Sequence, residues 1–337
     1  MTELYPIKFE PILKDKIWGG SSLVKNYGKK ADPARLIGES WELSAVQDNL
    51  SIISNGFLAG NNIEEIIEVY MSDITGEAVF EKYGNEFPLL IKFLEAKQDL
   101  SVQVHPDDKI AMERHNAYGK TEMWYILETE PFSKVYTGFT HPITRDILKN
   151  ALSEGNLISL LNEESAEYGD VFFTPAGRIH AIGSGSVLVE IQQTSDITYR
   201  IFDWNRKDSK GKSRDLHVDL ALDAIDYEAA GKNKIRKEIT TDKTENLVNC
   251  PYFHTNILHF SSLIRKDYNI IDSFIIYICI AGEFIIHWDK GAEIVTKGET
   301  VLIPAMFTDV VLEPRPDARV LEVFTNSPNF QTKILKS

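Results

Sequence analysis

Short β-rich runs separated by turn-forming residues recur along the chain and limit the folds open to it more than any other feature. The clearest runs are Leu89–Phe93, Met123–Leu127, Val171–Thr174, Val187–Ile191 and Thr300–Ile303. Gly, Pro, Asn and Asp often stand between such runs, as they do in antiparallel sandwiches and barrels. Helical periodicity is confined to three segments, at about 62–83, 144–161 and 216–229. We therefore expect a mainly β protein with a few peripheral helices.

A weak internal repeat divides the chain. The 337 residues correspond to about two domains of roughly 150 residues each. The segment 169–176 matches 298–305, because both have a glycine turn, an apolar strand and a proline at the strand end. A polar stretch at 230–246 separates the two copies. We expect an N-terminal domain over 1–235, which includes the helical inserts, and a C-terminal domain over 236–337.

The first copy carries polar residues that the second copy lacks. The pattern Gly-(Asp/Glu)-x4-Pro followed by Gly-x2-His, which ends at His180, is typical of cupins, small jelly-roll barrels that hold a metal between their strands. When the copies are aligned, Phe274 replaces Glu122 and Asp309 replaces His180. We expect two cupin-type jelly-roll units, of which the first binds a metal and the second does not.

Potential metal ligands lie on neighbouring strands of the first copy. Alternation along a strand places Ser101, Gln103 and His105 on one face, and the next strand presents Lys120 and Glu122 in the same way. A third strand begins near His180. Two imidazoles, a carboxylate and an amide oxygen suit a borderline divalent ion such as zinc, with coordination left for water or substrate.

The run from Glu190 to Arg200 has polar residues at every even position. Such alternation is typical of a half-buried strand pair with one solvated face. The alternative is a pocket wall, because Glu190, Asp196 and Arg200 together could handle protons and developing negative charge.

Composition excludes several classes of partner. Subtracting 50 acidic from 36 basic side chains gives a net charge of −14, which opposes binding to nucleic acid or anionic lipid. Cys250 and Cys279 form no CxxC pair, and the start of the chain lacks the layout of a signal peptide. The most apolar stretch, 274–281, is far shorter than the about 20 residues of a membrane span. We expect a cytoplasmic protein with no membrane partner.

At these residues the sequence resembles the type I mannose-6-phosphate isomerases, also called phosphomannose isomerases, in their short bacterial form. The matching pieces are Trp18-Gly19-Gly20, Gly38-Glu39-Ser40-Trp41-Glu42, Leu89-x2-Lys92, Leu100-Ser101-x-Gln103-Val104-His105-Pro106, Gly119-Lys120-Thr121-Glu122-x-Trp124-Tyr125, Pro175-x-Gly177-x2-His180 and Asp196-x3-Arg200. They follow the family's order over most of the chain.

The resemblance implies a role for each matching residue. It makes Gln103, His105, Glu122 and His180 the ligands of one zinc ion per chain. It places four further residues in the catalytic pocket, namely Arg200, Glu190, Asp196 and Lys92, and puts Ser101 and Lys120 near the substrate phosphate. Longer members carry a histidine where this chain has Gly119, so the ring-opening role of that histidine does not transfer.

The activity implied by the resemblance is zinc-dependent interconversion of mannose 6-phosphate and fructose 6-phosphate through a cis-enediol. The partner is then a small sugar phosphate, and the protein is a monomer or homodimer. Two other functions compete. A cupin with two histidines and a carboxylate could be an iron oxygenase, although Gln103 and the basic pocket residues argue against this. A non-catalytic sugar-binding or regulatory cupin is the second, and retention of all the proposed ligands with Arg200 argues against it.

Overall fold

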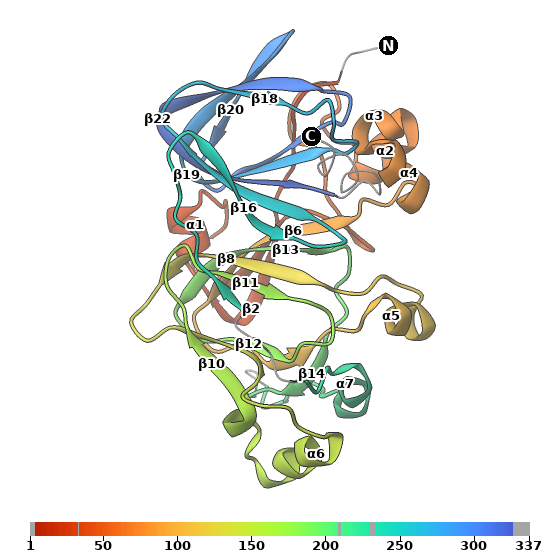
Figure 1. Cartoon of the computed structure of the whole chain (residues 1–337), viewed down its shortest axis with the longest axis vertical. Helices are drawn as coiled ribbons and strands as arrows, with labels where there is room; N and C mark the ends of the chain where they lie inside the picture. The colour runs from red at the N-terminus through yellow and green to blue at the C-terminus, as the bar shows by residue number, and fades with distance from the viewer. Residues whose placement is uncertain (1–3, 33, 208–209, 229–232, 326–337) are drawn as a thin grey trace.

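The structure is a computed structural model that describes residues 4–325, apart from 33, 208–209 and 229–232. Within the described residues, three large antiparallel sheets follow one another along the long axis of the molecule (Figure 1). We call them the lower, middle and upper sheets, as they lie in that view. The expected mainly β architecture is therefore confirmed.

The middle sheet runs in the order β15-β11-β8-β13-β6-β3-β2. Its strands are β2 (Ile12–Gly20), β3 (Ile37–Leu43), β6 (Leu89–Ala96), β8 (Glu122–Thr129), β11 (Val171–Thr174), β13 (Ser186–Gln193) and β15 (Lys234–Ile235). The lower sheet has the order β10-β9-β12-β7-β14, with β7 (Val102–Val104), β9 (Lys134–Phe139), β10 (Leu161–Ser165), β12 (His180–Ile182) and β14 (Tyr199–Phe202). A small pair joins β4 (Ala45–Val46) to β5 (Asn49–Leu50).

The upper sheet contains the second copy of the repeat, in the order β1-β21-β19-β22-β17-β16. Its strands are β1 (Ile7–Lys8), β16 (Lys243–Asn249), β17 (His254–Phe260), β19 (Ile275–Trp288), β21 (Thr300–Ile303) and β22 (Asp309–Phe324), with β18 (Ile264–Asp267) on β22 and β20 (Gly291–Thr296) on β19.

The middle sheet is buried on both faces because side chains alternate along its strands. On β13, Val189 and Ile191 belong to a core cluster that also contains Ile276 and Leu321 of the upper sheet. Leu188, which points the other way, packs in a separate cluster with residues of the lower sheet. One face of the middle sheet therefore holds the two halves of the molecule together, and the other face turns towards the lower sheet.

The internal repeat is present in the pairing of the strands. Gly169 and Gly298 precede β11 and β21 with φ of 84° and 90°, a conformation that favours glycine. In register, Trp124 lies opposite Phe172 and Glu190. In the second copy Tyr277 lies opposite Val301 and Glu322 in the same way. The two units therefore share one strand arrangement.

This register corrects the alignment of Glu122 by one residue. Glu122 pairs with Thr174, whose counterpart in the repeat is Ile303, and Ile303 pairs with Ile275. Phe274, which the sequence places opposite Glu122, instead lies in the core between the sheets. Because adjacent residues of a strand point to opposite faces, a shift of one residue exchanges an inward for an outward side chain.

The proposed division of the chain at residue 235 remains a prediction. β15 pairs with β11 of the middle sheet, whereas β16, which begins at Lys243, belongs to the upper sheet. β1 is an exception, because Ile7 pairs with Leu302 of the upper sheet. Residues 229–232 of the linker and 326–337 of the C-terminal unit lie outside the described residues.

Helices occur in the three expected segments, but in shorter pieces. The first segment divides into α2 (Ile63–Tyr70), α3 (Ser72–Thr75) and α4 (Glu77–Tyr83), interrupted at Met71 and Gly76, where φ is positive. The second gives α6 (Arg145–Glu154) and a 3₁₀ turn, η1 (Leu157–Leu160). The third gives α7 (Val218–Ala224), and residue 229 of that segment is outside the described residues.

The expectation that helices are confined to these segments is wrong. The structure adds α1 (Ser22–Asn26) and α5 (Asp108–His115). α5 buries only Ala111, so it leaves no apolar stripe in the sequence. Its caps define it instead: the Asp107 carboxylate accepts a hydrogen bond from the Ile110 amide, and Asn116 ends the helix in the left-handed conformation. In the described part of the chain, no helix has the length and apolar character needed to cross a membrane.

The core between the middle and upper sheets leads to a prediction about unfolding. Leu321 is fully buried there, so Leu321→Ala should lower the free energy of unfolding by about 2–5 kcal/mol. Because the same core supports both units, urea unfolding followed by circular dichroism and by tryptophan fluorescence should show one coincident transition. Val69→Ala, at a residue that is 71% exposed on α2, is the control and should change little. A second transition that stays at the parental midpoint would contradict this view of the core.

Candidate active site

His105, Glu122 and His180 meet in the interior between the middle and lower sheets. His105 follows β7, Glu122 begins β8 and His180 begins β12. His105 Nε2 lies 3.4 Å from Glu122 Oε2, and His180 Nε2 lies 3.3 Å from Glu122 Oε1. One ligand atom from each residue falls within 4.8 Å of the others, and all three side chains are buried. The structure thus brings together three residues that are spread over 75 positions of the chain.

Backbone carbonyls orient both imidazoles. His105 Nδ1 lies 2.8 Å from the Ile197 carbonyl oxygen, and His180 Nδ1 lies 2.8 Å from that of Arg178. An Nδ1–H that donates to a carbonyl leaves the Nε2 lone pair free to bind a metal. Burial lowers the pKa of both rings, that of His180 to about 3, so both are neutral at pH 7. Neutral imidazole is the form that coordinates metals.

Glu122 is ionised, and its carboxylate forms an ion pair with Lys120, whose Nζ lies 3.1 Å from Oε2, but accepts no hydrogen bond within the described structure. Burial alone raises the pKa of its carboxyl, but Lys120 and the two histidines outweigh burial and hold the pKa well below its usual range. Among the described residues, neither Glu122 oxygen nor His105 Nε2 has a hydrogen-bond partner. Burying such atoms without a hydrogen bond lowers the stability of the folded protein, because their lost contacts with water are not replaced. A divalent ion such as zinc fits this donor set, because it would satisfy all three orphaned atoms at once.

Gln103, the expected fourth ligand, lies beside this group. Its backbone pairs with His180 on one side and Arg200 on the other. In the structure its amide nitrogen lies 3.2 Å from His180 Nε2, and its amide oxygen faces the Ser101 hydroxyl at 3.3 Å. Rotation of the amide by half a turn would present the oxygen to a metal. Gln103 as a ligand therefore stays a prediction.

A pocket of about 300 Å³ opens beside the three residues. Of the residues singled out from the sequence, its lining contains Lys92, Gln103, Lys120, Glu190, Asp196 and Arg200. Lys120 links the pocket to the candidate metal ligands, because its Nζ lies 3.1 Å from Glu122 Oε2. Ser101 is absent from the lining, but its hydroxyl contacts Arg200 Nε at 3.3 Å.

Glu190 is held rigidly in the pocket wall. Lys92 Nζ donates to Glu190 Oε1 at 2.8 Å, and Trp124 Nε1 donates to the other oxygen at 2.9 Å. Lys92 also donates to Gln192 at 2.6 Å. Burial would lower the pKa of the Lys92 ammonium, but Glu190 and Glu39 outweigh it and raise the pKa. The Lys92 ammonium therefore stays charged inside the protein.

The run from Glu190 to Arg200 lines the pocket rather than a solvated face. β13 ends at Gln193 and β14 begins at Tyr199, so the run is two strands joined by a loop. Glu190 is buried in the first strand, Asp196 is exposed in the loop, and Arg200 is partly buried in the second strand. All three nevertheless reach the same pocket, which agrees with the second of the two sequence interpretations.

Other pocket residues carry polar groups but received no role from the sequence, among them Lys16, Glu39, Trp41 and Arg214. Trp41 Nε1 donates to Glu39 at 2.6 Å, and Lys16 Nζ lies 3.0 Å from the same carboxylate. Burial raises the pKa of Glu39, but Lys92 and Lys16 outweigh it and bring the pKa to about 2. The alternation of Glu39 and Trp41 in a β-rich segment is a signal that could have found this pair. Arg214 lies in an irregular loop, which gives no such periodicity.

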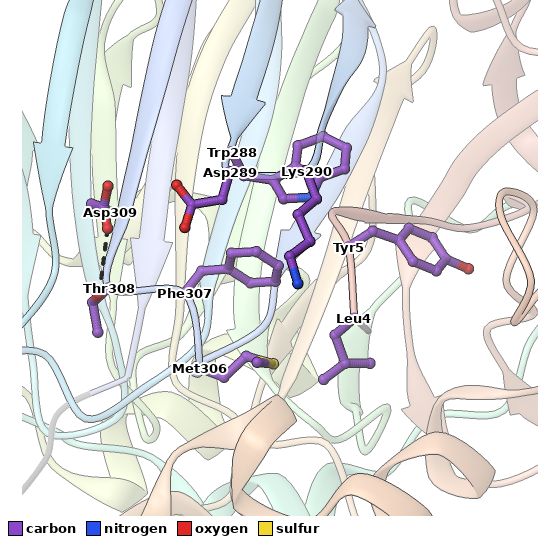
Figure 2. Close-up of a pocket in the computed structure, with 9 residues that line it drawn as sticks. All are labelled: Leu4, Tyr5, Trp288, Asp289, Lys290, Met306, Phe307, Thr308 and Asp309. Carbon is purple, nitrogen blue, oxygen red and sulfur yellow. Dashed lines mark hydrogen bonds between the residues drawn. The ribbon is translucent and has the colours of Figure 1, made fainter. Parts of the chain in front are cut away.

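A second pocket, of about 360 Å³, lies between the β19–β20 turn, the loop before β22 and the segment that contains Leu4 and Tyr5 (Figure 2). Aromatic and aliphatic side chains such as Trp288, Phe307 and Met306 form much of its wall. Asp309, the counterpart of His180, lies at its edge and accepts a hydrogen bond from Thr308. This pocket has no histidine in its lining, so the metal-binding chemistry of the described residues is concentrated in the first unit.

Comparisons with known proteins agree with this site. Residues 7–130 match the family described as phosphomannose isomerase type I, catalytic domain. The chain is 36% identical over 251 residues to mannose-6-phosphate isomerase ManA of Bacillus subtilis (strain 168), a match that covers 74% of this chain and 77% of that protein.

Solved structures have the same fold. A crystal structure of the mannose 6-phosphate isomerase from Bacillus subtilis superposes with a TM-score of 0.82 at 28% identity and covers 95% of this chain and 99% of that chain. A mannose 6-phosphate isomerase bound with zinc and yttrium superposes with a TM-score of 0.76 at 18% identity, covering 96% of this chain and 100% of that one, and supports the fold alone. The neighbours confirm the cupin-type architecture expected from the sequence.

The cluster of His105, Glu122 and His180 leads to a prediction about metal content. His180→Ala should lose the bound divalent ion, because two of three buried donors cannot replace the full set. His287→Ala is a matched control, since His287 also contacts a glutamate, Glu313 at 2.6 Å, but at the surface. Elemental analysis by mass spectrometry should find metal in the parent and control but not in His180→Ala. Equal metal content in all three proteins would refute the site.

Proposed function

The chain belongs to the type I phosphomannose isomerase family of aldose–ketose isomerases, and we propose that it interconverts mannose 6-phosphate and fructose 6-phosphate with one zinc ion per chain. The observation that carries the proposal is the group of buried ligand atoms on His105 and Glu122 that make no hydrogen bond among the described residues, with His180 beside them, at the side of a polar pocket. The zinc-bound relative supports the choice of metal.

The proposed reaction moves a proton between adjacent carbons of the open-chain sugar through a cis-enediol. Zinc, when bound, supplies polarisation of the carbonyl and hydroxyl oxygens of the substrate. The residues proposed to hold it are His105, Glu122 and His180, with Gln103 as a fourth ligand after rotation of its amide. The protein must then remove the carbon-bound proton, stabilise the oxyanion and bind the phosphate.

Two carboxylates are available for proton transfer, and their surroundings differ. Both oxygens of Glu190 already accept hydrogen bonds, from Lys92 and Trp124. Among the described residues, the Asp196 carboxylate accepts no hydrogen bond. The Thr198 hydroxyl donates instead to the backbone carbonyl oxygen of Asp196. We propose that Asp196 takes up the proton, while Glu190 holds the Lys92 ammonium against the substrate.

Arg200 is the proposed stabiliser of the oxyanion. It lies opposite Gln103 across the β7–β14 pair, on the same side as the candidate metal ligands. Its guanidinium is held by the Ser101 hydroxyl at 3.3 Å and the Asp215 carbonyl oxygen at 2.9 Å. A preorganised donor of this kind favours the transition state because it does not have to reorganise as charge develops. Ser101 and Lys120 remain the proposed substrate-binding residues.

The direct test of the function is a coupled assay for fructose 6-phosphate formed from mannose 6-phosphate. The parent should turn over, a chelator should abolish the activity, and added zinc should restore it, because the donor set needs the ion. Circular dichroism should show that most of the β structure survives chelation. Full activity of protein shown by elemental analysis to be metal-free would refute the zinc requirement, and no turnover with zinc bound would refute the isomerase.

Arg200→Ala separates an enzyme from a binding protein. If Arg200 acts in the transition state, the variant should lose about 10²-fold or more in kcat with a smaller change in KM. Zinc content should stay at the parental level. Arg200→Lys should recover part of the loss, because an ammonium lacks the planar fork of a guanidinium. Arg236→Ala, at an exposed arginine paired with Glu167, is the control and should behave as the parent. Near-parental kcat in zinc-loaded Arg200→Ala would remove Arg200 from the mechanism.

A further inference from the structure

The lysines of the pocket have little net charge to offer a substrate. Each is paired with a carboxylate: Lys16 with Glu39 at 3.0 Å, Lys92 with Glu190 at 2.8 Å, and Lys120 with Glu122 at 3.1 Å. A sugar phosphate carries nearly two negative charges, and binding it in a partly buried pocket requires unbalanced positive charge. That charge must come from elsewhere in the lining.

Arginines supply it at one side of the pocket. Arg200 and Arg214 both line the pocket. Arg214 shares a single carboxylate, that of Asp203, with Arg206. Arg206 and Arg214 therefore share one carboxylate, and Arg200 forms no ion pair among the described residues, so this side of the pocket offers positive charge that no carboxylate fully balances. Burial lowers the pKa of Arg200, and the nearby charge of Arg214 lowers it further.

Asp203 fixes the direction of the Arg214 guanidinium. Its side chain is only 7% exposed, and it accepts from Arg214 Nε at 2.8 Å and from Arg214 Nη2. Such a two-point contact holds the planar group in one orientation. Arg214 Nη1 and Arg200 Nη2 donate to no protein group in the described part of the chain. These donors are available to a ligand.

The depth of the residues in the pocket indicates that the phosphate lies on the side of Arg200 and Arg214. The reacting carbons are at one end of the open-chain sugar and the phosphate is at the other, so the phosphate lies away from the metal ligands. In this arrangement the phosphate does not reach Lys120, which the family resemblance places near it. Lys120 and Glu122 are almost completely buried, at 5% and 0% side-chain exposure, whereas the Arg214 side chain is 31% exposed. The Arg214 side is therefore the outer part of the pocket, and the Ser101 hydroxyl reaches it through Arg200.

We propose that Arg214, positioned by Asp203, binds the phosphate group of the substrate and makes the pocket specific for phosphorylated sugars. The inference rests on the proposed isomerase function for the identity of the sugar, but the phosphate contact itself does not need turnover. Arg214 binds substrate and product equally in this scheme, because the phosphate takes no part in the proton transfer.

Kinetics of zinc-loaded protein test the proposal. Arg214→Gln should raise KM for mannose 6-phosphate by about 10-fold to 100-fold, the loss expected for one charge-assisted hydrogen bond, with kcat within about 3-fold of the parent. Arg214→Lys should recover part of the affinity. Asp203→Asn, which weakens the support of Arg214, should raise KM in the same direction. The matched control is Arg145→Gln, since Arg145 pairs with Asp223 at 2.7 Å outside the pocket. Unchanged KM in Arg214→Gln would overturn the proposal.

Calorimetry with inorganic phosphate as the probe separates this inference from the isomerase function. Phosphate should bind the zinc-loaded parent and the Arg145→Gln control, and it should bind Arg214→Gln at least about 10-fold more weakly. If the parent binds phosphate through Arg214 but does not isomerise mannose 6-phosphate, the function fails and the phosphate site stands. If the parent isomerises and phosphate binds Arg214→Gln as tightly as the parent, the assignment of Arg214 is wrong.

Discussion

The chemistry of this protein depends on the alternation of side chains across the two faces of the middle sheet. Along β13, Val189 and Ile191 face the apolar core shared with the upper sheet, while Glu190 between them faces the pocket. Each strand must satisfy an apolar and a polar environment at once, and a period of two residues is what allows it. A slip of one residue would bury the carboxylate in the core and expose valine to the pocket.

Buried charge in the pocket is better explained by chemistry than by stability. The side chains of Lys92 and Glu190 are only 6% and 5% exposed, and the energy of bringing both ions out of water offsets much of their attraction. An apolar pair of the same volume would be about as stable. Retaining the pair keeps a fixed ammonium and a fixed carboxylate in contact with the space where substrate binds, which an apolar pair could not provide.

Period-two alternation and the glycine–proline repeat predicted the β architecture, and the motif ending at His180 together with the family resemblance predicted the meeting of His105, Glu122 and His180. Features that leave no periodic pattern in the sequence could not be predicted. α5 depends on its caps, and Arg214 reaches the pocket from a loop through its contact with Asp203. The alignment of Glu122 with Phe274 was wrong by one residue because both Phe274 and Ile275 are apolar, so hydrophobicity alone could not set the register.

The pairing of β1 with β21 has a consequence for the order of events during synthesis. Ile7 is synthesised well before its partner Leu302, which lies far further along the chain. The metal ligands, by contrast, are all complete by His180. The first unit can therefore assemble its site while the chain is still growing. β1 stays unpaired until β21 has been synthesised.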